Sequence, residues 1–151
     1  MEFITGLITN QVLISAAAGW FVAQVSKVII DMIQNGFSVE RLTGSGGMPS
    51  SHSATVTALA VSAGIVYGGG SFEFVMALFF AIIVIYDAQG VRMETGKEAK
   101  VLNRMRQRDI DAGMEPVYEK PLQEKMGHTM PEIIVGIIIG VAAAIIVCNI
   151  M

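Results

Sequence analysis

Residues 133–151 read IIVGIIIGVAAAIIVCNIM, a stretch that contains no charged side chain. It has nearly the length of the ~20-residue helix that crosses the hydrocarbon core of a bilayer. Three further apolar segments precede it, at about residues 4–33, 54–67 and 72–86. The first segment is interrupted by Gln24, Ser26 and Lys27, and the other two are shorter than a full span. The sequence therefore predicts an all-α, polytopic membrane bundle of about four transmembrane helices.

The composition agrees with this fold class. Apolar residues make up 53% of the 151 residues, charged residues make up 15%, and the mean hydropathy is +0.60. Soluble domains carry roughly 25% charged residues. The length indicates a single integral membrane domain, residues 1–151. The first residues lack the basic region of a signal peptide, so we expect the first span to be retained. The single cysteine, Cys148, cannot form an intrachain disulfide.

Small residues indicate how these segments are connected and packed. Gly68, Gly69 and Gly70 separate the two short segments, which predicts a tight hairpin or helices that extend into their polar flanks. A re-entrant second segment is the less favoured alternative. Gly136 and Gly140 are four residues apart, a spacing that lets helices approach closely in lipid. We expect this step to pack within one bundle, although such a face would also suit a homo-oligomer.

The ten basic residues predict the topology. Lys27 and Arg41 lie near the first connection, and the other eight lie between Arg92 and Lys125. Because cytoplasmic loops are enriched in Lys and Arg, we expect both connections in the cytoplasm and both termini outside. An even number of spans fits this placement. The absence of a long soluble domain and of a targeting segment favours a prokaryotic inner membrane.

The long connection, residues 91–130, divides into two halves. Residues 92–108 have an amphipathic helical pattern, and Glu94 and Lys97 are spaced to pair across one turn. This pattern predicts an interfacial amphipathic helix on anionic lipid, with headgroup binding as the alternative. Residues 109–121 are expected to be irregular.

The two histidines, His52 and His128, each lie at the charged end of an apolar segment. A histidine beside a membrane span is costly and indicates a functional site. The alternative is an imidazole that only bonds between helices or lies at the surface. Two histidines expected on one face, together with Lys27 and Arg92, favour the functional interpretation.

A glycine-rich stretch, GSGGMPSSHSA at residues 44–54, precedes and contains His52. Its glycines allow the backbone to bend, and Pro49 suits a first helical turn. The amides of a helix start attract phosphate. We therefore expect an anion to be bound by residues of this stretch, namely Gly47, Ser50 and Ser51. The alternative is an ordinary capped helix entry after a flexible loop.

Glu132 lies four residues after His128, and Pro131 marks the start of the last helix. On a shared helix face, the carboxylate would hold the imidazole and fix its tautomer, as the third member of a catalytic triad does. Thr129 and Glu132 also fit a capping box. The sequence leaves both roles open.

Asp87 and Arg92 follow the third apolar segment. Arg92 is a candidate phosphate clamp, because its forked donors suit phosphate oxygens. Asp87 needs a cationic partner, and Arg92 and Lys27 are the candidates. Lys27 either places its charge on the same anion or snorkels to the interface.

Three stretches resemble a known family: GGMPSSHSA (46–54), YDAQGVR (86–92) and KMGHTMPEIIVG (125–136). Together with Lys27, they are similar to the divergent branch of the type-2 phosphatidic acid phosphatase superfamily. The superfamily motifs are K-x6-R-P, P-S-G-H and S-R-x5-H-x3-D. Here no Arg-Pro follows Lys27, Ser51 replaces the glycine, Glu132 replaces the aspartate, and no Ser-Arg pair precedes His128. Arg92 would supply the missing arginine.

The resemblance implies a metal-independent lipid phosphomonoesterase without a cofactor. His128 would attack phosphorus and form a phosphohistidine, Glu132 would orient it, and His52 would act as acid and base. Phosphate-binding residues would be Lys27, Arg92, Ser50, Ser51 and Gly47, with Asp87 in support. The substrate would be a membrane phospholipid of the phosphatidylglycerophosphate or phosphatidic acid type, and we expect no nucleic-acid partner.

Two alternatives to the phosphatase use the same observations. A non-catalytic membrane module that binds an anionic headgroup or a partner protein would explain the incomplete motifs. A small transporter would place its polar residues near the bilayer midplane, whereas here they gather at one edge.

Overall fold

The computed structural model describes residues 2–36 and 47–151, and all the regular secondary structure within these ranges is helical. The helices are α1 (Glu2–Ile8), α2 (Gln11–Asn35), α4 (Ser51–Tyr67), α5 (Phe72–Gln89), α6 (Val91–Asp111) and α7 (Met130–Ile150). The predicted all-α class is therefore confirmed. Arg41, Gly44 and Gly46, to which the sequence assigned roles, lie outside the described residues.

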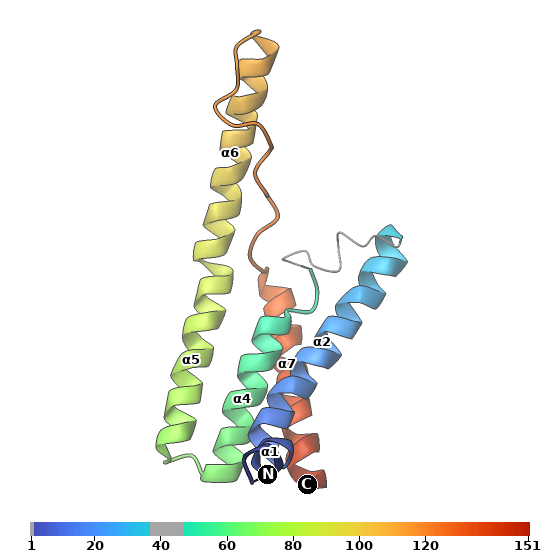
Figure 1. Ribbon diagram of the computed structural model, residues 1–151, viewed down its shortest axis with the longest axis vertical. Helices are drawn as coiled ribbons and strands as arrows, with labels where there is room; N and C mark the ends of the chain where they lie inside the picture. Colours follow the sequence, from blue (N-terminus) through green and yellow to red (C-terminus); the bar gives the residue numbers. More distant parts are fainter. Residues whose placement is uncertain (1, 37–46) are drawn as a thin grey trace.

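The helices α2, α4, α5 and α7 pack into a bundle, and consecutive ones run in opposite directions (Figure 1). The helix α4 is central, because it packs against α2, α5 and α7. Both termini lie at one end, and the long connection between α6 and α7 begins at the other (Figure 1). On which side of a membrane each end lies remains a prediction.

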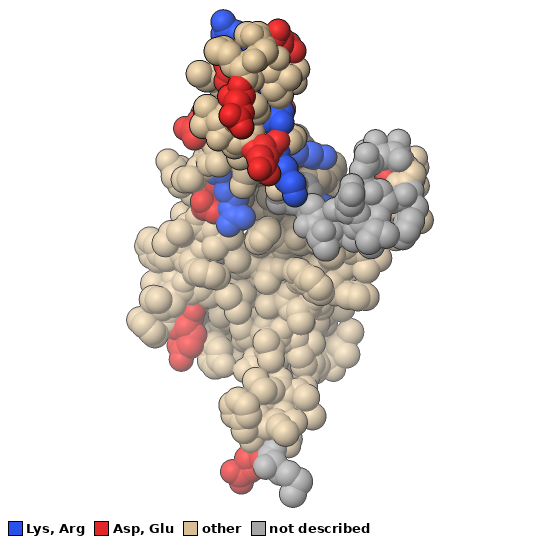
Figure 2. Space-filling model, turned by 45° about the horizontal axis from the view of Figure 1, so that its top comes forward, with Lys and Arg blue, Asp and Glu red and all other residues tan. Residues whose placement is uncertain are grey.

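The outer surface of the bundle is apolar. Among the described residues, three helical stretches are long and apolar enough to cross a membrane: Gln11–Ile33, Phe72–Asp111 and Met130–Ile150. The second of these stretches comprises α5 and α6. The helix α4 has 17 residues and is shorter. Large side chains such as Phe79, Ile83 and Ile138 are exposed on the outer faces, an arrangement that is unfavourable in water and suits lipid. Charged side chains gather mainly beyond one end of this apolar body (Figure 2).

The first apolar segment is divided rather than continuous. The side chain of Asn10 accepts hydrogen bonds from the backbone amides of Val12 and Leu13, each at 3.0 Å. Because these amides have no partner within the helix, an asparagine cap favours a new helix start at this point. The chain therefore forms the short α1 before the membrane-length α2.

Small side chains let α4 approach its neighbours closely. A Cβ atom on Gly136 would lie 2.5 Å from the Ser50 carbonyl oxygen, and one on Gly140 would lie 2.5 Å from that of Ala54. From α2, a Cβ atom on Gly19 would lie 3.0 Å from the same Ala54 oxygen. The Gly136–Gly140 step is therefore filled by α4 within the bundle, as expected.

The hairpin between α4 and α5 follows the sequence prediction. Gly68 has φ of +91°, a conformation that favours glycine, and the Ser71 hydroxyl accepts a hydrogen bond from the Phe74 amide at 3.1 Å. Both helices also extend into polar flanks, since α4 begins at Ser51 and α5 ends at Gln89.

The helix α6 continues the line of α5 and projects beyond the bundle (Figure 1). Helical hydrogen bonds continue through Gly90, whose amide donates to the Tyr86 oxygen and whose carbonyl accepts from the Glu94 amide. The predicted pair between Lys97 and Glu94 forms at 2.7 Å. The predicted helix is therefore present, and its contact with anionic lipid remains a prediction.

Candidate functional site

Four structural elements meet at the charged end of the bundle. They are the second half of α2 with Lys27, the start of α4 with His52, the α5–α6 junction with Arg92, and the start of α7 with His128. The centroids of the two imidazole rings are 6.1 Å apart, and the ring planes are inclined by 56°. The structure thus brings together two histidines that are far apart in the sequence.

A backbone contact joins the starts of α4 and α7. The Ser50 amide donates a hydrogen bond to the Glu132 carbonyl oxygen at 3.0 Å. The close approach of Gly136 to the Ser50 oxygen lies one helical turn further along α7. These contacts fix the relative position of the two helix starts and therefore of His52 and His128.

His128 is only 7% exposed and is attached to the α5–α6 junction. Its backbone amide donates to the Ala88 carbonyl oxygen at 2.9 Å. The preceding Gly127 has φ of +77°, and a Cβ atom there would lie 2.8 Å from both the Ala88 oxygen and Met93. Only glycine fits this approach, which places His128 beside the junction that carries Arg92.

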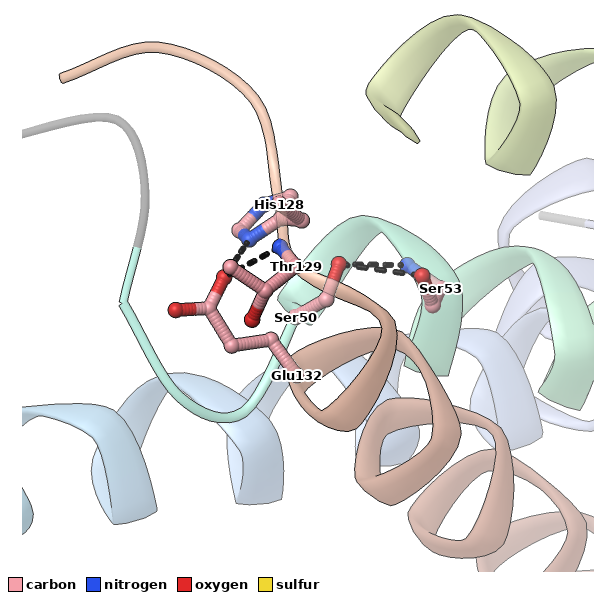
Figure 3. Close-up of polar contacts among 5 residues, drawn as sticks. All are labelled: Ser50, Ser53, His128, Thr129 and Glu132. Atoms are coloured by element: carbon pink, nitrogen blue, oxygen red, sulfur yellow. Dashed lines mark hydrogen bonds and ion pairs between the residues drawn. The ribbon is translucent and has the colours of Figure 1, made fainter. Parts of the chain in front are cut away.

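The Glu132 carboxylate makes both of the contacts that the sequence left open. One oxygen, Oε2, lies 3.0 Å from His128 Nδ1 and also accepts from the Thr129 amide at 3.1 Å (Figure 3). A carboxylate beside Nδ1 favours the tautomer with the proton on that nitrogen. The lone pair of the neutral ring is then on Nε2.

Arg92 and Asp87 form an ion pair across the junction. Arg92 Nε lies 2.6 Å from Asp87 Oδ2, and both side chains are partly exposed. Of the two cationic partners that the sequence suggested for Asp87, Arg92 forms the ion pair. It uses the Nε edge of the guanidinium, so a phosphate group would approach the Nη groups.

His52 lies in a positive electrostatic environment at the charged end of the molecule, outside the three candidate spans. Partial burial lowers the pKa of His52, and electrostatic interactions with His128, Arg92 and Lys27 lower this pKa further, while Asp87 opposes them. The His52 ring is therefore neutral at a lower pH than an ordinary histidine. Binding of a phosphate dianion would counter this effect.

Substituting Arg92→Gln is expected to raise the pKa of His52 toward the ordinary histidine value, because the change removes a nearby positive charge and releases Asp87. The measurement is an NMR titration of labelled histidine without substrate. Lys97→Gln is the matched control, since Lys97 is an exposed, paired cation on the same helix. An unchanged or lowered His52 pKa in Arg92→Gln would contradict this electrostatic description.

Lys27 and Gly47 adjoin one another. A Cβ atom on Gly47 would lie 3.3 Å from Lys27 Cε, and Gly47 has φ of +95°. Lys27 is also within electrostatic range of Lys125, Glu132 and Asp31. Lys125 was not among the site residues expected from the sequence, although it lies only three residues before His128.

The serines before His52 are placed differently from one another. Ser50 is fully buried, and its hydroxyl accepts from the amide and the hydroxyl of Ser53 at 3.3 and 3.0 Å (Figure 3). Ser51 is partly exposed in the first turn of α4. Pro49 precedes the Ser50 cap, so its expected place in the first turn is wrong. The alternative role of this stretch as a capped helix entry is therefore realised by Ser50.

The arrangement of His, Cys, Asp and Glu side chains shows whether a metal ion could be held. Among the described residues, no group of three or more His, Cys, Asp or Glu side chains is arranged to hold a metal ion. The described site contains two imidazoles, the cations Lys27 and Arg92, and the carboxylates Glu132 and Asp87.

Comparisons with known proteins agree with the resemblance found in the motifs. Residues 8–143 match the model of the divergent PAP2 family. The chain is 35% identical over 150 residues to YuiD of Bacillus subtilis (strain 168), an uncharacterized membrane protein, with 93% of this chain and 95% of that relative covered. No solved structure matches. The chain belongs to the divergent PAP2 family of membrane proteins.

Proposed function

We propose that this protein is a metal-independent lipid phosphomonoesterase whose active site is the charged end of the bundle. The observation that carries the proposal is a buried His128, held through Nδ1 by Glu132, with the His52 ring 6.1 Å away. A nucleophile, an orienting carboxylate and a second titratable group are the parts that covalent phosphoryl transfer requires. Family membership supports the reaction class.

In the first step, His128 Nε2 attacks phosphorus. The N–P bond forms while the ester P–O bond breaks, and protonated His52 donates its proton to the departing alkoxide. Glu132 stabilises the positive charge that develops on the His128 ring, because its Oε2 remains hydrogen-bonded to Nδ1. The product of this step is a phosphohistidine and a dephosphorylated lipid.

In the second step, neutral His52 takes a proton from water. The water oxygen bonds to phosphorus, the N–P bond breaks, and inorganic phosphate leaves with His128 restored. His52 has regained the proton that it donated, so the cycle is balanced and needs neither metal nor cofactor.

Cations and amides stabilise the phosphoryl group during both steps. Phosphoryl transfer depends mainly on positioning and on donors to the equatorial oxygens. Lys27 and Arg92 provide the charges, with Asp87 positioning the guanidinium. Gly47 and Ser51 provide backbone amides, and Ser50 fixes the helix start that presents them.

The location of the site determines the substrate class. The apolar faces lie in lipid, and the site lies where charged residues begin, so a phosphomonoester at headgroup depth would reach it. Lipids of the phosphatidylglycerophosphate or phosphatidic acid type meet this requirement. We place the site on the cytoplasmic face of a prokaryotic inner membrane, with both termini outside, because most basic residues lie between Arg92 and Lys125, in and after the helix that projects from this end.

The test is phosphate release by purified protein in detergent from a panel of lipid phosphomonoesters, with and without EDTA. We expect release from at least one monoester, at a rate that EDTA leaves unchanged, because the proposed steps use only side chains. A phosphodiester lipid is the control and should release no phosphate.

Two outcomes would contradict the proposal. Release that needs an added divalent cation would exclude the metal-independent mechanism. No release from any lipid by a folded protein would instead favour a module that binds an anionic headgroup.

A further inference from the structure

The helix α6 is fastened to the chain that returns from its tip, and Asn103 makes most of this contact. Its Nδ2 donates to the Leu122 carbonyl oxygen at 2.8 Å and to Glu124 Oε1 at 2.9 Å. Its Oδ1 accepts from the Leu122 amide at 2.8 Å and from the Tyr118 hydroxyl at 3.3 Å. One amide side chain thus forms four hydrogen bonds with residues 15 to 21 positions away.

Arg106, one turn further along α6, binds the same returning chain. Its Nε donates to the Tyr118 carbonyl oxygen at 3.0 Å, and its Nη2 donates to the Glu119 carbonyl oxygen at 2.6 Å. We call Asn103 and Arg106 together the clasp, and residues 112–127 the return segment. The backbone of the return segment, which has no regular structure, is paired with side chains of α6 at this point.

Between the clasp and His128, the return segment runs along α6. A Cβ atom on Gly96 would lie 2.6 Å from the Glu124 carbonyl oxygen. Gly127 then packs on Ala88 and Met93, and the next residue is His128. The contacts form a continuous path from Asn103 to the proposed nucleophile.

We propose that the clasp is a positioning device for His128: it holds the return segment against α6 and thereby fixes the imidazole that faces His52. The catalytic consequence rests on the proposed function, whereas the positioning itself does not. Glu132 and the Ala88 oxygen hold His128 locally, and the irregular return segment is the stretch of chain that leads from α6 to His128. An unfastened segment would leave the His128 backbone free to open away from the junction.

The test compares the reactivity of the two histidines toward diethyl pyrocarbonate, measured by mass spectrometry of each peptide in the same sample. In Asn103→Ala, we expect His128 to be modified roughly tenfold faster than in the wild type, because several hydrogen bonds that oppose opening are lost. The rate at His52 should change much less, since His52 lies on α4 and is not held by the return segment. In the same variant, kcat should fall by a similar factor, with a smaller change in KM.

Gln107→Ala is the matched control. Gln107 is also an amide on α6, but its hydrogen bond goes to Asp111 of the same helix at 2.9 Å. This variant should leave both modification rates and kcat as in the wild type. Circular dichroism and gel filtration establish that each variant is folded.

If Asn103→Ala does not fold, the comparison of Asn103→Asp with the double variant Asn103→Asp/Glu124→Gln tests the same proposal. Asn103→Asp retains the acceptor oxygen but places a carboxylate beside Glu124. Adding Glu124→Gln supplies a donor to that carboxylate. Diethyl pyrocarbonate should therefore modify His128 more slowly in the double variant than in Asn103→Asp alone.

Three results would overturn the proposal: an unchanged His128 rate in folded Asn103→Ala, an equal rise at both histidines, or no rescue by the double variant. If the wild type releases no phosphate, the proposed function fails, but the modification rates still decide whether the clasp positions His128.

Discussion

His128→Ala is expected to lower the rate of phosphate release by a factor on the order of 10³ or more, because the proposed nucleophile is removed. The remaining cations and amides should still bind the phosphate group, so lipid binding measured by fluorescence should change little. The measurement is kcat on the preferred monoester, with thermal unfolding to show that the bundle is intact. Release that persists near the wild-type rate would exclude His128 as the nucleophile.

Glu132 variants separate the two roles of this carboxylate. Glutamine also fits the capping box, so Glu132→Gln should preserve stability while the neutral amide stabilises a cationic imidazole poorly. We expect kcat to fall by roughly 10²–10⁴, as for the orienting carboxylate of a catalytic triad. Glu132→Ala should lose the same activity and, in addition, about 1 kcal/mol of stability. Equal kcat in Glu132→Gln and the wild type would assign Glu132 to capping alone.

Gly136→Val is expected to have the largest effect on stability. Even a Cβ atom at this position would lie 2.5 Å from the Ser50 carbonyl oxygen and 3.0 Å from the Ser53 side chain. The helices α4 and α7 must therefore separate, and overpacking of this kind costs about 1–3 kcal/mol or more. The Ser50–Glu132 backbone hydrogen bond would be broken as well, so the site should be lost with the packing.

The measurement is thermal unfolding and gel filtration in detergent. Ala142→Val is the matched control, because Ala142 lies on the exposed face of α7 and should tolerate two added methyl groups. Wild-type stability in Gly136→Val would contradict the packing described for α4 and α7. A changed oligomeric state with unchanged stability would indicate that Gly136 faces a second copy instead.

Local sequence determined what could be predicted about the helices. Apolar runs indicated the membrane helices, and the glycines at 68–70 indicated the hairpin, since both features act within a few residues. The division at Asn10 was not predicted, because a single cap within an apolar run gives a weak signal. The continuation of α5 into α6 through Gly90 was not predicted either, because long-range packing determines the direction of the chain there.

The candidate site was predictable where its geometry is local. His128 and Glu132 are four residues apart on the chain, so a contact between them could be expected. The expected shared helix face is wrong, however, because His128 precedes α7 and the contact forms at the helix N-terminus. The Ala88 carbonyl oxygen has no sequence signal, since every residue has one. The hydrogen bonds of Asn103 join positions 15 to 21 residues apart, and no motif marks them.

The most direct test of the central claim is to trap the phosphorylated histidine. An aryl phosphate lipid analogue has a leaving group that needs no acid, so His52→Ala should still form the intermediate but should lack the base that activates water. After a rapid quench at alkaline pH, where phosphohistidine persists, mass spectrometry should find the phosphoryl group on residue 128 of His52→Ala. His128→Ala is the control and should carry none. A phosphoryl group on another residue, or phosphate release by the wild type with no phosphorylated residue in His52→Ala, would contradict the mechanism.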